Sequence, residues 1–387
     1  MRCSVASADF FTQDTIQRFS PLLVMYAQED NGPSSAPWFL DRSRLVFAER
    51  GPICDDEPIY DGPWTDTATR KLGLLVRSGN RWRYQTQETL LCHRSGHVFL
   101  ATDHTRPYNS DRHPSLHRDE GFYLSANLDS AGAKGGMSFT KATGSHEFAT
   151  DAPIYYDDGE LFSQGGSAKN PRQAYISYWF FYPFNDAPRA GFLFNHQGDW
   201  ENITLLFQQG AGSSPLWTLE AVSYSAHGAP KAIAAACSIA PSGKGLLSCP
   251  VPRTQWDGKS RLVGFVADGS HATYSSPGPH PIRTAHGLAT DHTSSIASGF
   301  SWPSWEALLP LESQGWAGFC GAWGKVASPI RPFAGDKTGP LGPGCLDEQE
   351  RQRKRGGPSA WGISKSSPED RSATPGQAIG VDPVGGI

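Results

Sequence analysis

The chain of 387 residues has 34 Lys and Arg against 38 Asp and Glu, a formal net charge of −4. This balance lacks the basic excess of nucleic-acid-binding proteins, so we expect no nucleic-acid partner. No apolar run approaches the roughly 20 residues that span a bilayer, and the first residues lack the apolar core of a signal peptide. We therefore expect a cytoplasmic protein, with export by a non-classical route left open.

The composition favours strands over helices. The chain contains 42 Gly, 30 Pro and 12 Trp, which suits short strands and many loops. We expect residues 1–17 to be a lead-in, residues 18–345 to form a single β-rich domain with its core motifs in 150–285, and residues 346–387 to be a disordered tail. The seven cysteines form no CxxC pair, so disulfide pairing stays open. Nothing in the sequence sets an oligomeric state.

Apolar bursts of strand length, separated by turn residues, recur along the chain. They predict strands near 44–50, 71–77, 81–86, 97–108, 152–158, 173–184, 201–210, 216–228 and 261–275. Helical periodicity is confined to 12–23 and 301–311. The segment 105–150 is rich in Asn, Asp, Gly, Ser and His and predicts a long excursion between strands. The fold class that follows is mainly β: a β-sandwich core of two packed sheets, with long loops and a few short helices.

Charged residues stand directly before an apolar strand in "FNHQGDWENITLLF", residues 194–207. Strand alternation places Asp199 and Glu201 on the face that continues into the core. His196 has the other parity, but a bend at Gly198 brings its imidazole round. Asp186 lies in a turn just upstream. Because unpaired carboxylates at the edge of a core are costly, the pattern predicts a compensating cation.

An oxygen-rich ligand set with a single imidazole favours Mg²⁺ or Ca²⁺, or Mn²⁺, over zinc. The roles of the carboxylates and of two further histidines stay open. The carboxylates can instead cap turns or pair with Arg172 or Arg189. Two histidines that follow strong strands, His227 and His271, are candidate general bases or simply hydrogen-bonded loop residues.

Several motifs resemble the vacuolar-protein-sorting protein 62 family, which includes a plant group of unknown function. They are the "SYWFFYPFNDAP" strand, the H-x-G-D-W-E motif at 196–201, the "SYSAHG" turn and "GSHATY" at 269–274. The opening "FSPLLVMYAQEDNGPSSAPWFL" and the late "GAWGKVASPIRPFAGDKTGPLGPG" are also similar. The resemblance runs from about residue 18 to residue 345 and implies a link to vacuolar sorting.

A more distant resemblance is to the necrosis-and-ethylene-inducing-like cytolysins. These carry a Y-x-W-Y-x-P-K-D strand, an H-R-H-D-W-E motif and an S-x-S-A-H-G segment in the same order. The resemblance implies that Asp186, His196, Asp199 and Glu201 surround a divalent cation. Gly198 stands where the cytolysins have a second histidine.

Three functions are compatible with these motifs. The first is a divalent-cation-dependent binding module that recognises a lipid headgroup or glycan. Trp38, Trp302 and Trp305 are then candidates for peripheral membrane contact, and ordinary packing is the alternative for each of them. The second is a metal-dependent hydrolase of a phosphodiester or glycan with His227 or His271 as base. The third is a structural interaction protein in vacuolar sorting. Whether the chain is an enzyme stays open.

Overall fold

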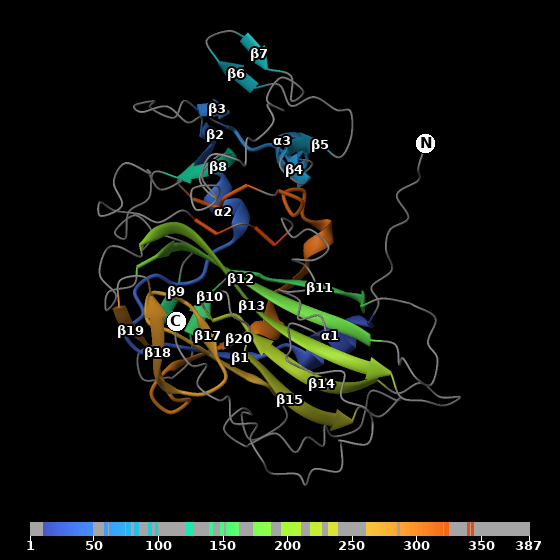
Figure 1. Ribbon diagram of the computed structural model, residues 1–387, viewed down its shortest axis with the longest axis vertical. Helices are drawn as coiled ribbons and strands as arrows, with labels where there is room; N and C mark the ends of the chain where they lie inside the picture. Colours follow the sequence, from blue (N-terminus) through green and yellow to red (C-terminus); the bar gives the residue numbers. More distant parts are fainter. Residues whose placement is uncertain are drawn as a thin grey trace.

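The computed structural model confirms a mainly β protein with several sheets and few short helices (Figure 1). It describes residues 11–48, 58–60, 62–73, 75–78, 81–84, 92–94, 97–99, 121–126, 139–141, 148–150, 152–161, 173–186, 195–209, 217–226, 231–238, 261–284, 287–319, 321–324, 339–340 and 342–343. The tail expected at 346–387 lies outside these residues. No helix within these ranges is long and apolar enough to cross a membrane.

The largest sheet has six strands in the order β15-β14-β13-β12-β11-β21 (Figure 1). Neighbours pair antiparallel except β21, which runs parallel to β11. The bounds are β11 Ile154–Leu161, β12 Gln173–Asn185, β13 His196–Gln209, β14 Trp217–Tyr224, β15 Lys231–Ser238 and β21 Leu308–Pro310. Strand β15 was not expected from the sequence, because its run of small residues carries little strand signal.

A second sheet has four strands in the order β17-β16-β1-β20. Its members are β1 Leu22–Met25, β16 Val263–Val266, β17 Thr273–Tyr274 and β20 Phe300–Pro303. Strand β1 pairs parallel with β16 and antiparallel with β20, so segments more than 200 residues apart in sequence lie side by side.

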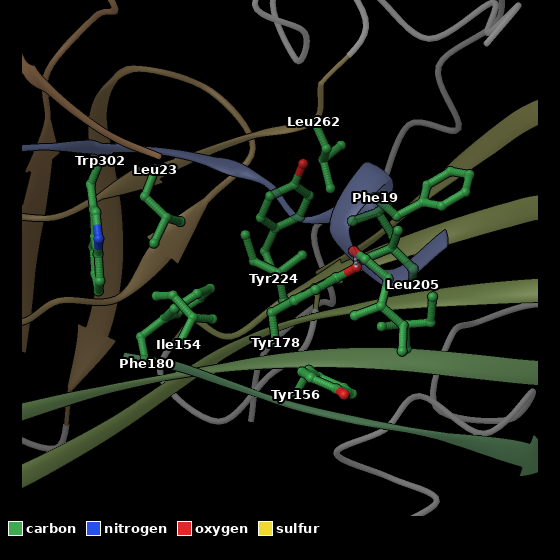
Figure 2. Close-up of a cluster of buried hydrophobic side chains, with 14 of the residues drawn as sticks. Phe19, Leu23, Ile154, Tyr156, Tyr178, Phe180, Leu205, Tyr224, Leu262 and Trp302 are labelled. Carbon is green, nitrogen blue, oxygen red and sulfur yellow. Dashed lines mark hydrogen bonds between the residues drawn. The ribbon is translucent and has the colours of Figure 1, made fainter. Parts of the chain in front are cut away.

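The two sheets enclose the main hydrophobic core (Figure 2). Where they approach, Gly264 of β16 faces Ile203 of β13, and a Cβ at that glycine would lie 2.6 Å from the Ile203 side chain. Residues of both sheets and of the first helix fill the core, among them Phe19, Leu23, Ile154, Tyr178, Phe180, Leu205, Tyr224 and Trp302. The expected sandwich of two packed sheets therefore forms around this core.

Strand β12 is buried on both faces. Its even-numbered residues from Ala174 to Tyr182 lie in the main core, whereas Trp179 and Phe181 pack into a second cluster on the opposite face. A strand covered on both sides reads as a continuous apolar run. This explains why "AYISYWFFYPF" does not alternate between apolar and polar residues.

Segments from the N-terminal and the C-terminal parts of the chain cover the second cluster. Helix α2, Ala36–Leu40, contributes Phe39, and the late segment 311–323 contributes Trp316 and Trp323. Helix α3, Asp66–Gly73, and a three-stranded sheet in the order β3-β2-β8 complete this layer. That sheet consists of β2 Ser43–Ala48, β3 Pro58–Tyr60 and β8 Gly121–Ala126.

Four hairpins complete the strand inventory of the described residues. They are β4 Leu75–Ser78 with β5 Arg81–Tyr84, β6 Cys92–Arg94 with β7 His97–Phe99, β9 Phe139–Lys141 with β10 Phe148–Thr150, and β18 Gly278–Thr284 with β19 Gly287–Thr293. The expected excursion at 105–150 thus contains β8, β9 and β10.

The helix expected at 12–23 is α1, Gln13–Phe19, capped by the Thr12 side chain. Because Phe11 and Ile16 lie in the main core, packed structure begins earlier than residue 18. The helix expected at 301–311 is wrong. This stretch is β20, the 3₁₀ turn η3 Ser304–Glu306, β21 and the start of a second 3₁₀ turn, η4 Leu311–Ser313, because pairing with β1 and β11 overrides its weak helical period.

Gly198 bends β13 near its start. Its φ of +61° lies in the left-handed region, as the sequence suggested for this position. On its N-terminal side, the Gln197 side chain binds the backbone of Ala126 in β8, whereas beyond it Trp200 lies in the second cluster. The backbone of Trp323 passes so close that a Cβ on Gly198 would lie 1.9 Å from its carbonyl oxygen.

We therefore expect Gly198→Ala to lower the free energy of unfolding by more than about 3 kcal/mol, since the methyl group meets backbone as well as an unfavourable φ. Chemical denaturation of both variants measures this. Gly278→Ala is the matched control, because its φ is +116° but no atom lies within 4 Å of the added Cβ. It should cost about 1–2 kcal/mol. Equal losses would contradict the close approach of Trp323.

Candidate functional site

Polar side chains gather where β12 ends and β13 begins. The two strands pair Tyr182 with Asp199 and Asn185 with His196. The turn after β16 docks against this end, because the Asp186 amide donates to the carbonyl of Gly269 at 3.0 Å. The predicted residues of the H-x-G-D-W-E motif and of the "GSHATY" segment therefore lie at one end of the six-stranded sheet.

His271 is the centre of this cluster and is fully buried. Its Nδ1 lies 3.1 Å from Asp199 Oδ2, and its Nε2 lies 3.0 Å from the carbonyl oxygen of Asn31. The carboxylate of Glu29 lies 3.8 Å from the same Nε2. The imidazole also stacks flat on Tyr182, with 3.9 Å between ring centroids and 3° between planes.

The hydrogen-bond partners of the two ring nitrogens indicate the protonation state of His271. A carboxylate and a backbone carbonyl both accept hydrogen bonds, so Nδ1 and Nε2 both donate and the ring is an imidazolium. Burial lowers the pKa of His271, but Asp199 and Glu29 more than offset this and raise it to about 10. Neither nitrogen has a lone pair to accept a proton from a substrate, which disfavours His271 as a general base. His227 lies outside the described residues.

Glu29 is a buried carboxylate held by backbone amides. Its Oε1 accepts from the Asn31 amide and its Oε2 from the Gly269 amide, each at 2.7 Å. Charge-assisted bonds of this kind compensate the loss of water. Glu29 therefore joins the segment after β1 to the turn that carries His271.

Glu201 projects from the same face of β13 as Asp199. One of its oxygens accepts a hydrogen bond from the Ser225 hydroxyl, which in turn accepts from the Asn202 amide at 2.7 Å. Burial and then the charge of Asp199 raise the pKa of Glu201 well above its ordinary value, although Ser225 and His271 offset part of this rise. A positively charged group beside Asp199 and Glu201 would therefore lower the electrostatic cost of burying these two carboxylates.

His196 and Asp186 are each oriented through one atom. His196 Nδ1 lies 2.8 Å from the Gly198 carbonyl, which can only accept, so this nitrogen is the donor and Nε2 is the atom that faces a ligand. Asp186 Oδ1 accepts from the Asn195 side chain at 2.8 Å. A histidine whose second nitrogen donates to a carbonyl is in the tautomer that metal ligation requires.

In each of the four predicted metal ligands, one polar side-chain atom forms a hydrogen bond with a neighbouring group. These atoms are Asp186 Oδ1, His196 Nδ1, Asp199 Oδ2 and Glu201 Oε2. The opposite atom of each is the one available to a ligand. As placed, however, no three His, Cys, Asp or Glu side chains among the described residues converge closely enough to hold a metal ion.

Three buried oxygen atoms beside this cluster have no hydrogen-bond partner: Asn31 Oδ1, Asn185 Oδ1 and Ser270 Oγ. The first belongs to the turn that binds His271, and Asn185 donates to the Ser270 carbonyl at 3.5 Å. Unpartnered buried oxygens are costly and mark places where an ion or water is expected. The remaining atoms of this kind among the described residues are indole nitrogens of the second cluster.

A second histidine–tyrosine stack lies nearby. His280 of β18 stacks on Tyr274 with 3.8 Å between centroids and 5° between planes. The Tyr274 hydroxyl donates to Asp291 Oδ2 of β19 at 2.7 Å. Asp291 contributes to the raised pKa of Glu201, so its charge acts on the same cluster.

Sequence reasoning missed several of these residues. Glu29 and Asn31 lie in the opening "YAQEDNGPSS", but no local pattern indicates that they reach His271, 240 residues away in sequence. Ser225 stands in the quoted "SYSAHG" segment without an expected role. Membrane contact is wrong for Trp302, which lies in the core as the packing alternative expects. Trp38 and Trp305 are half-buried, each beneath an arginine, Arg42 or Arg261.

Comparison of the chain with models of known families, with curated protein sequences and with solved structures finds no match in any of the three.

The contacts of Ser225 predict a cost for its removal. Ser225→Ala removes the donor to Glu201 and leaves the Asn202 amide without its acceptor, so we expect a loss of about 1–3 kcal/mol in the free energy of unfolding. Urea denaturation measures this loss. The exposed Ser313, whose hydroxyl donates to the Pro310 carbonyl, is the matched control. Ser313→Ala should change stability by less than about 0.5 kcal/mol, and a similar loss for both would contradict the role of Ser225.

Proposed function

We propose that this end of the six-stranded sheet binds a divalent cation, and that the cation joins the chain to an oxygen-bearing ligand. The observation that carries the proposal is the charge of the cluster. Three carboxylates, Glu29, Asp199 and Glu201, surround the single imidazolium of His271. With Asp291 also acting on Glu201, the carboxylates outnumber the one positively charged side chain, and this excess of acidic groups favours a bound cation.

The donor atoms fit a hard cation. Asp199 and Glu201 supply carboxylate oxygens, and the unpartnered oxygens of Asn185 and Ser270 are neutral donors of the kind that Ca²⁺ and Mg²⁺ accept. Mg²⁺ in particular is often bound by only one or two carboxylates and keeps several waters. Such a site is compatible with the absence of a three-ligand group among the described side chains.

The remaining two predicted ligands complete the hypothesis. His196 is in the ligating tautomer, and Asp186 is attached by its amide to the turn that carries Ser270 and His271. The resemblance to the cytolysins implies the same four residues. It also supports a ligand on a membrane surface, such as a phosphorylated or glycosylated lipid headgroup, whose oxygens would complete the coordination of the cation.

A binding role is placed before hydrolysis because both ring nitrogens of His271 are already bound, to Asp199 and to the Asn31 carbonyl, which disfavours this candidate base. In the binding role, its imidazolium supplies a fixed positive charge beside Asp199. The cation supplies a Lewis acid that attracts phosphate or hydroxyl oxygens. Ligand recognition then depends on the cation without requiring turnover.

Calorimetric titration of metal-stripped protein with Ca²⁺, Mg²⁺ and Mn²⁺ tests the site. We expect at least one cation to bind, and Asp199→Ala to weaken its binding at least tenfold, since a carboxylate ligand is lost. The matched control is Asp158→Asn, which removes a carboxylate charge from β11, towards the other end of the sheet, where Asp158 accepts from the Phe11 amide. Absence of binding to the unmodified chain, or equal binding by Asp199→Ala, would sink the proposal.

Vesicle sedimentation tests the ligand. We expect the chain to sediment with vesicles that contain a phosphoinositide or a glycosylated lipid only when the cation is present, and not with phosphatidylcholine alone. Chelation with EDTA should release it. Competition by soluble inositol phosphate or by the free sugar distinguishes the two headgroups. Cation-independent sedimentation would contradict a bridging role for the metal.

A further inference from the structure

Three segments that are distant in sequence meet at the His271 ring. They are the turn after β16, which carries the histidine itself, β13 with Asp199, and the segment after β1 with Glu29 and Asn31. Tyr182 of β12 covers one face of the ring. All five side chains are at least nine-tenths buried, so their contacts are screened from water.

The backbone at His271 is held in an uncommon conformation. Its φ of +53° lies in the left-handed region, and among the described residues it is the only non-glycine with a positive φ. Such a conformation costs on the order of 1–3 kcal/mol and persists only where surrounding contacts enforce it. Here the conformation places the ring between two acceptors, at Asp199 and Asn31.

We propose that His271 is a positioning residue of the cation site, which fixes the Asp199 carboxylate by donating to one of its oxygens while anchoring the segment after β1 through the Asn31 carbonyl. This inference rests on the proposed function. Because Oδ2 of Asp199 is bound to the imidazole, Oδ1 is the oxygen turned to the cation. Histidine suits this position because both ring nitrogens donate along opposite directions from one rigid plane.

The test compares His271→Gln with His280→Gln in the full chain. Both histidines stack on a tyrosine at nearly the same distance, but His280 binds Ser276 and Thr293 instead of Asp199. A glutamine amide has both of its N–H donors on one nitrogen, so it cannot span the two acceptors that the two ring nitrogens of His271 reach. The cation affinity of each variant is measured by calorimetry with Ca²⁺, Mg²⁺ and Mn²⁺, well below its melting temperature.

We expect His271→Gln to weaken cation binding by about tenfold to a hundredfold, the usual cost of losing a residue that orients a ligand. His280→Gln should change affinity by less than about twofold while still lowering the melting temperature. Unchanged affinity in His271→Gln would assign the residue a purely structural role. Tighter binding would show that only its positive charge matters, and either result overturns the inference. No cation binding to the unmodified chain would overturn both this inference and the proposed function.

A measurement on the unmodified chain covers the case in which His271→Gln does not fold. Long-range nitrogen–proton NMR spectra of labelled histidine side chains report the protonation of both ring nitrogens, and contacts with the Tyr182 ring identify His271. We expect Nδ1 to carry the proton that Asp199 accepts, and the signal of this nitrogen to shift when the cation is added. An Nδ1 without a proton, or signals that the cation leaves unchanged, would overturn the positioning role.

Discussion

The antiparallel pairing of β12 with β13 is the constraint on which the rest of the structure depends. The strands stay in register from Gln173 paired with Gln208 to Asn185 paired with His196, and apolar layers cover both of their faces. Charged side chains are therefore costly along most of this pair. They occur at the end where the pairing stops, and this is where Asp199 and Glu201 lie.

The charged end is itself organised around one buried histidine. The single imidazolium of His271 offsets part of the charge of Asp199 and Glu29, which lowers the cost of burying these carboxylates next to an aromatic core. Glu201 lacks such a strong partner and relies on Ser225. Two carboxylates on the same face of β13 therefore differ in their partners. Asp199 forms an ion pair with His271, whereas Glu201 is bound only by a neutral hydroxyl.

How much of this could be predicted depends on whether the signal is local. Alternation along β13 placed Asp199 and Glu201 on one face, and Gly198 indicated the bend, because strand period and glycine conformation are properties of adjacent residues. The partners of His271 were not predictable, since Glu29 and Asn31 reach it across 240 residues. The choice between exposure and packing at Trp302 could not be made for the same reason: burial depends on what covers a side chain, and here β20 lies beside β1.

The close approach of Trp323 to Gly198 also orders events during synthesis. Strands β12 and β13 leave the ribosome well before residues 316–323, which cover Trp200 and Phe181, and before Pro340, whose carbonyl receives the Trp323 amide. Until those residues emerge, the aromatic face formed by Phe181 and Trp200 lacks its cover, whereas every residue that contacts His271 has already been made. Contacts between segments so far apart in sequence form slowly. The cover of the second cluster is consequently the last part of this end of the molecule that can form.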